Sequence, residues 1–406
     1  MVPVKIGLEN LGKEVVNDLK KKRVGLITNR TGITRDFEYT VDYFRRELGI
    51  KLATLFSPEH GFHLNEQAGE AVDSYYDKNL GIEIHSIYRR GKGSLKYKSQ
   101  DLDEKMRSFD IKDDGKFIPE AIADELDTVV LDIQDIGTRV YTHISSMANA
   151  MYTCARKGIE FIVLDRPNPI NGIDFEGPVL DYPKYRSFIG SYSITMRHGM
   201  TLGELARMFN EELFSGNVNL KVSRLKDWKS RMWFDQTGWP WVLPSPNMPS
   251  LDTATVYPGQ VMFEGTNVSE GRGTTRPFEI IGAPWIDGYK FARDINALKL
   301  EGVKVNEIRF TPTFSKYSTD HCYGIEIHVT DRTKFKPFRF SLKLLDWIIR
   351  NEGGEFDFYE KYFDRVAGNS YVRSKLLSGD LDNLWDRLAT DESEFKKRRD
   401  EYLLYR

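Results

Sequence analysis

Residues 52–61 read LATLFSPEHG, an apolar run that ends abruptly in a polar turn. The run predicts a buried strand, and the turn, bounded by proline and glycine, places the carboxylate of Glu59 beside the imidazole of His60. Such a pair at a strand end suits acid–base or nucleophilic chemistry. In the simpler interpretation Glu59 caps the turn and His60 orients the loop. Other parts of the sequence are therefore needed to choose between a catalytic and a structural role for this pair.

Strands and helices alternate along the first half of the chain. We predict strands at residues 23–28, 51–56, 82–87, 128–133 and 159–165, and helices at residues 11–21, 36–48, 118–124, 141–157 and 201–214. This alternation is typical of a parallel sheet covered by helices. The polar stretch 88–116 carries no clear pattern.

The pattern changes near residue 228. Residues 238–250, GWPWVLPSPNMPS, contain four prolines and follow no helical or strand period, which predicts one long ordered crossing into a second domain. Beyond it we predict helices at 288–300 and 338–350, strands near 304–310 and 324–330, and a charged, solvent-facing helix within 380–406. A chain of 406 residues is also too long for one average core.

Composition excludes several classes of protein. The net charge is −2, with both signs mixed along the chain, so there is no electrostatic footprint for nucleic acid or an anionic membrane. Two isolated cysteines suggest neither a disulfide framework nor a CxxC metal site. No apolar run approaches a membrane span, and no signal pattern opens the sequence. As given, it indicates a cytoplasmic protein; removal of a signal peptide would make it secreted or periplasmic.

Polar side chains follow each predicted strand, at the edge where the loops of a parallel sheet converge. Asp132 and Asp135 join Glu59 and His60 as catalytic candidates. Candidates for binding a substrate at this edge are Asn29, Gln134, Arg139, Tyr141, Asp165, Arg166, Asn168 and Glu176.

These acidic and basic residues also have alternative interpretations. Asp132 can bond neighbouring backbone amides, and Arg139 and Arg166 can pair with the carboxylates instead of an anionic substrate. Asp132, Asp135 and Asp165 together could hold Mg²⁺, but they lack a dense ligand spacing, so we predict no metal and no other cofactor.

A second polar, glycine-rich stretch, EGTNVSEGRGTT, covers residues 264–275. It matches neither the P-loop nor GxGxxG, and we predict that it forms the wall of a polar pocket. Its candidate substrate-binding residues are Asn267, Glu270 and Arg272. Four tryptophans flank it, mostly as core residues, although an exposed aromatic face would stack on a sugar ring.

Six motifs carry a resemblance to a known family. In order they are SPEHGF, LDIQDIGTRVYTHISSM, LDRPNPINGIDFEGP, RHGMTLGELA, PSPNMPS and FEGTNVSEGRGTTRPFEIIGAPW. Together they closely resemble the NamZ-type exo-β-N-acetylmuramidases of peptidoglycan recycling, and the resemblance covers nearly the whole chain. The ordered set is specific, although no single motif is decisive.

This resemblance implies an α/β fold: a Rossmann-like catalytic domain with a parallel sheet, placed at residues 1–228, and a smaller α+β domain, 229–406, that closes the cleft. It implies release of N-acetylmuramic acid (MurNAc) from the non-reducing end of peptide-free MurNAc–GlcNAc chains. The implied partner is therefore a peptidoglycan-derived saccharide, with no nucleic acid and no insertion into a membrane. The family's catalytic candidate falls on Glu59, with His60 beside it.

For such a reaction we expect Glu59 to protonate the leaving oxygen or to attack C1, with Asp132 or Asp135 as its partner. A carboxylate could also polarise the substrate's own acetamide group. The lactyl carboxylate of MurNAc requires a cation, for which Arg139, Arg166 or Arg272 are candidates.

Two other classes compete with this interpretation. A metal-dependent hydrolase or phosphatase would also place aspartates at these strand ends. A non-catalytic, two-lobed sugar-binding protein would share the cleft and the aromatic residues, although a single crossing between the lobes disfavours it.

Overall fold

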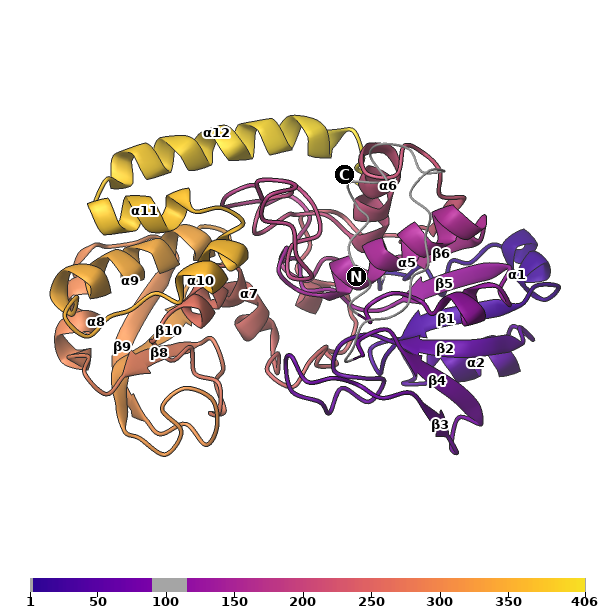
Figure 1. The fold of residues 1–406 in the computed structure, drawn as a ribbon, viewed down its shortest axis with the longest axis horizontal. Helices are drawn as coiled ribbons and strands as arrows, with labels where there is room; N and C mark the ends of the chain where they lie inside the picture. Colours follow the sequence, from indigo (N-terminus) through magenta and orange to yellow (C-terminus); the bar gives the residue numbers. More distant parts are fainter. Residues whose placement is uncertain (1–2, 90–114, 406) are drawn as a thin grey trace.

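The computed structural model describes residues 3–89 and 115–405, which form two lobes joined by long connections (Figure 1). The unpatterned stretch 88–116 lies almost entirely outside the described residues. No helix in the described ranges is long and apolar enough to cross a membrane.

The N-terminal lobe is built on a seven-stranded sheet with the order β3-β4-β2-β1-β5-β6-β7. All neighbours are parallel except the edge strand β3, which runs antiparallel to β4. The strands are β1 (Val24–Thr28), β2 (Leu52–Ser57), β3 (Tyr75–Asp77), β4 (Ile82–Ser86), β5 (Thr128–Asp132), β6 (Glu160–Leu164) and β7 (Leu220–Ser223). The predicted parallel sheet is confirmed; β3 and β7 are additional strands.

Helices cover both faces of this sheet. They are α1 (Lys13–Leu19), α2 (Thr40–Arg46), α4 (Glu120–Ala123), α5 (His143–Lys157) and α6 (Leu202–Glu212). Successive side chains of a strand point to opposite faces. In β5, accordingly, Val129 and Leu131 pack with α5 and α6, whereas Val130 packs in the core that contains α1 and α2. This two-sided burial explains the continuously apolar strands.

The smaller C-terminal lobe contains the antiparallel sheet β8-β10-β9 and its own core. Its strands are β8 (Ile280–Ala283), β9 (Val303–Phe310) and β10 (Cys322–Val329). Its helices are α7 (Leu251–Gln260), α8 (Gly288–Ala297), α9 (Pro337–Asn351), α10 (Glu360–Ala367), α11 (Tyr371–Ser378) and α12 (Leu381–Asp400). Short 3₁₀ turns lie at Phe234–Gln236 and Val261–Gly265. The α/β fold class with a smaller second lobe is confirmed. The sequence did not predict α7, which contains Pro258.

The last helix corrects two expectations. Helix α12 was predicted to face solvent, but it buries Leu384, Leu388 and Phe395 and runs from the C-terminal lobe to the N-terminal lobe (Figure 1). Tyr405 then enters the core beside β1 and β2. The prediction of a single crossing is therefore wrong, and it no longer counts against a two-lobed sugar-binding protein.

The division of the chain at residue 228 stays a prediction. Residues 238–250 are irregular, as predicted. However, Phe234 and Trp239 pack in the core of the N-terminal lobe, which favours a division closer to α7.

Candidate active site

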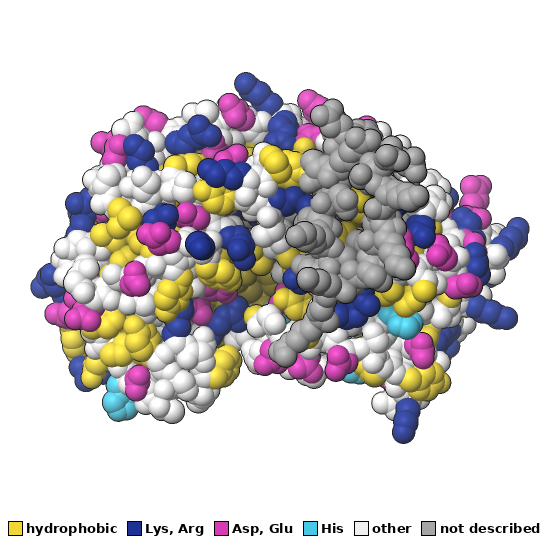
Figure 2. All heavy atoms as spheres, viewed as in Figure 1, with side chains coloured by type: hydrophobic (Ala, Val, Ile, Leu, Met, Phe, Trp, Pro, Cys, Tyr) yellow, Lys and Arg dark blue, Asp and Glu magenta, His cyan; other side chains and the backbone are white. Residues whose placement is uncertain are grey.

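A cavity of about 490 Å³ lies between the two lobes. This volume is within the usual range for small-molecule sites. Its walls come from the loop after β2, the start of α5, the loop 186–189, the irregular crossing, α7 and α10. In Figure 2 the recess between the lobes is bordered by apolar and basic side chains. The cavity is therefore composite, and neither lobe forms it alone.

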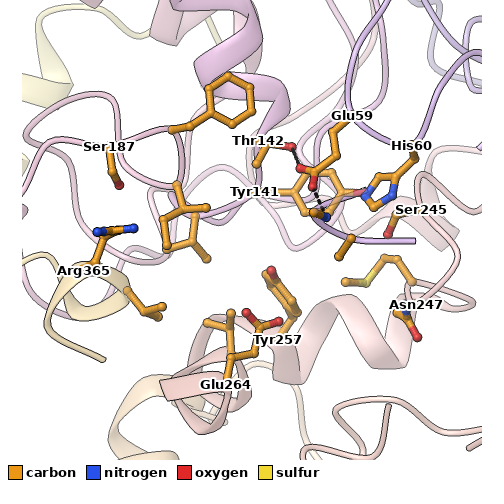
Figure 3. Close-up of a pocket in the computed structure, with 18 of the residues that line it drawn as sticks. Glu59, His60, Tyr141, Thr142, Ser187, Ser245, Asn247, Tyr257, Glu264 and Arg365 are labelled. Carbon is orange, nitrogen blue, oxygen red and sulfur yellow. Dashed lines mark hydrogen bonds between the residues drawn. The ribbon is translucent and has the colours of Figure 1, made fainter. Parts of the chain in front are cut away.

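Glu59 lies at one end of this cavity (Figure 3). One carboxylate oxygen, Oε1, accepts the backbone N–H of Gly69 at 2.8 Å, and Oε2 accepts the hydroxyl of Thr142 at 2.6 Å. Thr142 is the N-cap residue of α5, so the carboxylate also meets the positive end of that helix dipole. These contacts fix the orientation of the side chain.

The environment of Glu59 favours its ionised form. Burial raises the pKa of this carboxyl group, but the neighbouring His60 and hydrogen bonds from Thr142, Gly69 and Tyr88 outweigh burial and lower the pKa below its usual value. At neutral pH Glu59 is therefore a carboxylate, which suits a nucleophile or an electrostatic partner better than a proton donor.

His60 lies beside Glu59 in an unusual backbone conformation, with φ of 71°. Its Nδ1 is 2.8 Å from the carbonyl oxygen of Glu66, which accepts a hydrogen bond from the N–H of that nitrogen. Burial lowers the pKa of His60, against the opposing effect of the Glu59 carboxylate. The imidazole is therefore neutral at neutral pH, with Nε2 as its acceptor.

The opposite wall belongs to the C-terminal lobe. Arg272 pairs with Glu264 at 2.7 Å, and Glu264 also accepts the hydroxyl of Tyr362 at 2.9 Å. Burial lowers the pKa of this guanidinium, but the neighbouring acids Glu264 and Glu270 outweigh burial and raise the pKa above its usual value. Its charge is thus largely balanced within the wall.

Another of the cationic side chains that line the cavity, Arg365, lies at the end away from Glu59, near Ser187 (Figure 3). Its side chain is exposed and forms no ion pair with any described residue. Arg365 is therefore available to an anionic group of a ligand.

Of the residues that the sequence predicts, the structure brings Glu59, His60, Tyr141 and Arg272 to the cavity. Burial of Tyr141 raises the pKa of its hydroxyl, and Ser245 lies beside that hydroxyl. The remaining candidates lie outside the cavity lining, and most are held by bonds within the protein.

Asp132 does not reach the cavity. Its Oδ1 accepts Nε of Arg166 at 2.6 Å, its Oδ2 accepts Nη2 of Arg166 at 3.0 Å, and Thr40 donates a further hydrogen bond. Both partners of this pair are buried. Asp132 and Arg166 therefore leave the list of catalytic and substrate-binding candidates, because each neutralises the other.

Asp165 is also held within the N-terminal lobe. Its carboxylate accepts hydrogen bonds from the hydroxyls of Thr201 (2.7 Å) and Tyr405 (2.6 Å) and from the backbone of Gly203 (2.9 Å). Complete burial raises the pKa of Asp165 to about 6. Asp165 does not line the cavity; its hydrogen bond with Tyr405 holds the C-terminal end of the chain against the N-terminal lobe.

Arg139 joins the two lobes. Its guanidinium donates to the carbonyl oxygens of Pro178 and Ile194 in one lobe and of Val366 and Ala367 in the other. Burial lowers its pKa to about 10. Because these carbonyls occupy both terminal nitrogens, Arg139 is not free to hold a substrate carboxylate.

Four further candidates form hydrogen bonds with backbone groups and do not line the cavity. Gln134 donates to the carbonyl of Pro167, and Asn168 to that of Met200. Glu176 accepts the N–H of Arg339 at the start of α9, and Asn267 exchanges bonds with the backbone near residue 356. These side chains shape the loops and the contact between the lobes.

Asn29, Glu270 and Asp135 lie close behind the cavity wall. Asn29 accepts the N–H of Thr31, and Glu270 pairs with Lys316 at 2.8 Å. Asp135 accepts the N–H of Gly137, whereas its Oδ1 is buried and has no hydrogen-bond partner among the described residues. Asp135 stays a candidate for an electrostatic role.

Sequence reasoning missed Thr142, Tyr257 and Arg365, all of which line the cavity, and it included Glu264 in the predicted pocket wall without giving it a role. Thr142 directly follows Tyr141 at a predicted helix start, a position where a threonine cap is a usable signal. Arg365 had no local signal, because only the packing of α10 brings it to the cavity. Across residues 3–89 and 115–405 no cluster of three potential metal ligands occurs.

Family models match the chain along most of its length. The model described as exo-beta-N-acetylmuramidase NamZ, N-terminal, matches residues 24–118 and 114–252, and the corresponding C-terminal model matches residues 255–405. A curated protein, the peptidoglycan beta-N-acetylmuramidase NamZ of Bacillus subtilis (strain 168), is 41% identical over 404 residues. That match covers 99% of this chain and 91% of the relative.

Two solved structures share the fold. Both are DUF1343 family proteins from Bacteroides fragilis NCTC 9343. One has a TM-score of 0.85 at 30% identity and covers 100% of both chains; the other has a TM-score of 0.73 at 29% identity and covers 99% of both.

Proposed function

The chain belongs to the NamZ family of exo-β-N-acetylmuramidases, and we propose that it releases MurNAc from the non-reducing end of peptidoglycan-derived MurNAc–GlcNAc saccharides. It is a glycoside hydrolase by this assignment. The observation that carries the residue roles is the oriented, ionised carboxylate of Glu59 in the cavity between the lobes.

Glu59 acts in its ionised form. Cleavage of a glycosidic bond passes through a transition state with positive charge on the sugar ring, which a fixed carboxylate stabilises. Glu59 can do so by attack at C1 or by polarising the acetamide group of MurNAc. Its lowered pKa favours either role over the donation of a proton to the leaving oxygen.

His60 is the neutral partner of this carboxylate. Its Nδ1 is held by the carbonyl of Glu66, which leaves Nε2 as an acceptor for a proton, such as that of an attacking water molecule. The same hydrogen bond fixes the loop that carries Glu59, so His60 also acts as a positioning residue.

Arg365 is the partner of the lactyl carboxylate that distinguishes MurNAc from GlcNAc. It replaces Arg139 and Arg166 in this role, because those two arginines are already bonded within the protein. Arg272 is a weaker candidate, since Glu264 and Glu270 balance its charge. A free guanidinium binds a carboxylate through charge-assisted hydrogen bonds.

The direct test is product analysis on a defined MurNAc–GlcNAc disaccharide, followed by NMR so that the first anomer formed is seen. We expect free MurNAc and GlcNAc, with no metal added. A protein that binds the disaccharide without cleaving it, or that cleaves it only with added Mg²⁺ or Zn²⁺ after treatment with EDTA, would contradict the proposal.

A further inference from the structure

Helix α10 carries a row of three side chains that leads out of the cavity. Tyr359, Tyr362 and Arg365 are spaced three residues apart, and residues at this spacing lie on one face of a helix. Arg365 and Tyr362 line the cavity, whereas Tyr359, the N-cap residue, does not. At 1.5 Å per residue the row spans about 9 Å.

Tyr359 is firmly held but open to solvent. Its backbone N–H donates to the carbonyl of Gly265 at 2.8 Å, and the ammonium of Lys316 lies 5.8 Å from the centre of its ring. Even so, its side chain is 46% exposed, and that of Tyr362 is 37% exposed. Large exposed aromatic residues next to a site mark a binding surface more often than isolated ones do.

The aromatic surface continues beyond Tyr359. Tyr317 neighbours it and accepts the indole N–H of Trp285 at 3.1 Å, and both of these rings are partly exposed. Tyrosine and tryptophan offer apolar faces with polar edges, which is the character needed to pack against a sugar ring. We name Tyr359, Tyr317 and Trp285 the outer aromatic surface.

The reaction proposed above determines what can reach this surface. By this proposal the cavity holds the terminal MurNAc and the GlcNAc joined to it, and the remainder of a longer chain extends out of the cavity. The row on α10 links the cavity to the outer aromatic surface, so a saccharide that leaves the cavity along α10 passes over Tyr362 towards Tyr359.

We propose that the outer aromatic surface binds the sugars on the leaving-group side of the substrate, beyond the disaccharide unit that occupies the cavity. This proposal rests on the proposed function. Its consequence is a preference for chains longer than a disaccharide, since only these reach Tyr359.

The test compares MurNAc–GlcNAc with the tetrasaccharide (MurNAc–GlcNAc)₂, measuring kcat/KM for the first MurNAc released. The native protein should prefer the tetrasaccharide. Tyr359→Ala should lower kcat/KM for the tetrasaccharide about three- to tenfold, the effect of losing one aromatic contact, and leave that for the disaccharide unchanged. Unchanged turnover of the disaccharide also shows that the variant folds.

Two further variants separate stacking from other effects. Tyr359→Phe keeps the aromatic ring and should retain the preference for the tetrasaccharide. If the hydroxyl bound the sugar instead, this variant would lose the preference. Tyr76→Ala removes a tyrosine that is 58% exposed on the edge strand β3 of the other lobe and should change neither rate.

Equal losses on both saccharides in Tyr359→Ala, or no loss on either, would overturn this inference while leaving the proposed function intact. Absence of MurNAc release from either saccharide by the native protein would overturn the proposed function, and this inference with it.

Discussion

Glu59 and Asp132 are two carboxylates of the same sheet edge with opposite surroundings. Asp132 ends β5, and Glu59 follows β2 by two residues. Asp132 forms an ion pair with Arg166, and both side chains are buried. Glu59 is held by an amide, a hydroxyl and a helix N-terminus, without an arginine partner among the described residues, and it faces a cavity.

The difference shows what makes a carboxylate at a strand end available for chemistry. A buried charge needs compensation, and a guanidinium in two-point contact supplies it completely. Dipolar groups supply it only in part, so the carboxylate keeps its capacity to stabilise a positive charge on a substrate. Glu59 and Asp132 lie at the same edge of the sheet. What distinguishes the catalytic candidate Glu59 from the structural Asp132 is the group that compensates the charge of each.

Replacing Glu59 by Gln gives the largest expected effect. The side chain keeps its size and most of its hydrogen bonds but loses its charge, so turnover of MurNAc–GlcNAc should fall by about a thousandfold or more. The free energy of unfolding should change by less than about 1 kcal/mol. Glu70→Gln, an exposed change in the same loop, is the control and should keep the native rate.

Replacing Asp132 by Ala should lower the stability of the protein but not the turnover of the folded enzyme. The buried guanidinium of Arg166 is left without its counter-charge, which should cost about 3–5 kcal/mol of unfolding free energy in urea titrations. The folded fraction should retain turnover. Asp127→Ala, which breaks an exposed pair with Arg23 just before the same strand, should cost below about 1 kcal/mol. Similar losses for both variants would remove the contrast.

Replacing Arg365 by Ala tests the proposed partner of the lactyl carboxylate. Loss of a charge-assisted bond to the lactyl carboxylate should lower kcat/KM for the disaccharide about tenfold to a hundredfold. A substrate with that carboxylate esterified should react equally with both proteins. If the variant loses as much on the ester as on the free acid, Arg365 does not bind the lactyl group.

The pH dependence of kcat/KM distinguishes a Glu59 that acts as a carboxylate from one that acts as a protonated acid. The change in rate expected here is the smallest of the four predictions. Because the pKa values of Glu59 and His60 are both lowered, a carboxylate and a neutral imidazole persist through the neutral range. On acidification each takes up a proton, so the rate should decline rather than rise as the pH falls below the neutral range. A rate that increases as the pH falls would indicate that Glu59 donates a proton.

Much of this fold is readable from the sequence. Because the central strands are buried on both faces, they appear as short apolar runs between helices, and the loops after them appear as polar motifs. The predicted edge and the pair of Glu59 and His60 in the cavity follow from these local patterns.

Other features depend on contacts between distant parts of the chain, which local patterns do not encode. Nothing near Asp132 indicates that Arg166, 34 residues later, neutralises it. Likewise, α12 reads as a charged surface helix, because its buried leucines are few and its contact with the N-terminal lobe lies about 200 residues away in sequence. Arg365 reaches the cavity only through the packing of α10.

Chemical rescue tests the central claim most directly. Glu59→Ala removes the carboxylate and leaves space in a cavity open to small solutes, so formate should restore part of the lost MurNAc release. Asp132→Ala, whose site is sealed, should show no gain of rate with formate. Near-native release by Glu59→Ala without formate would contradict the assignment of Glu59 as the catalytic carboxylate.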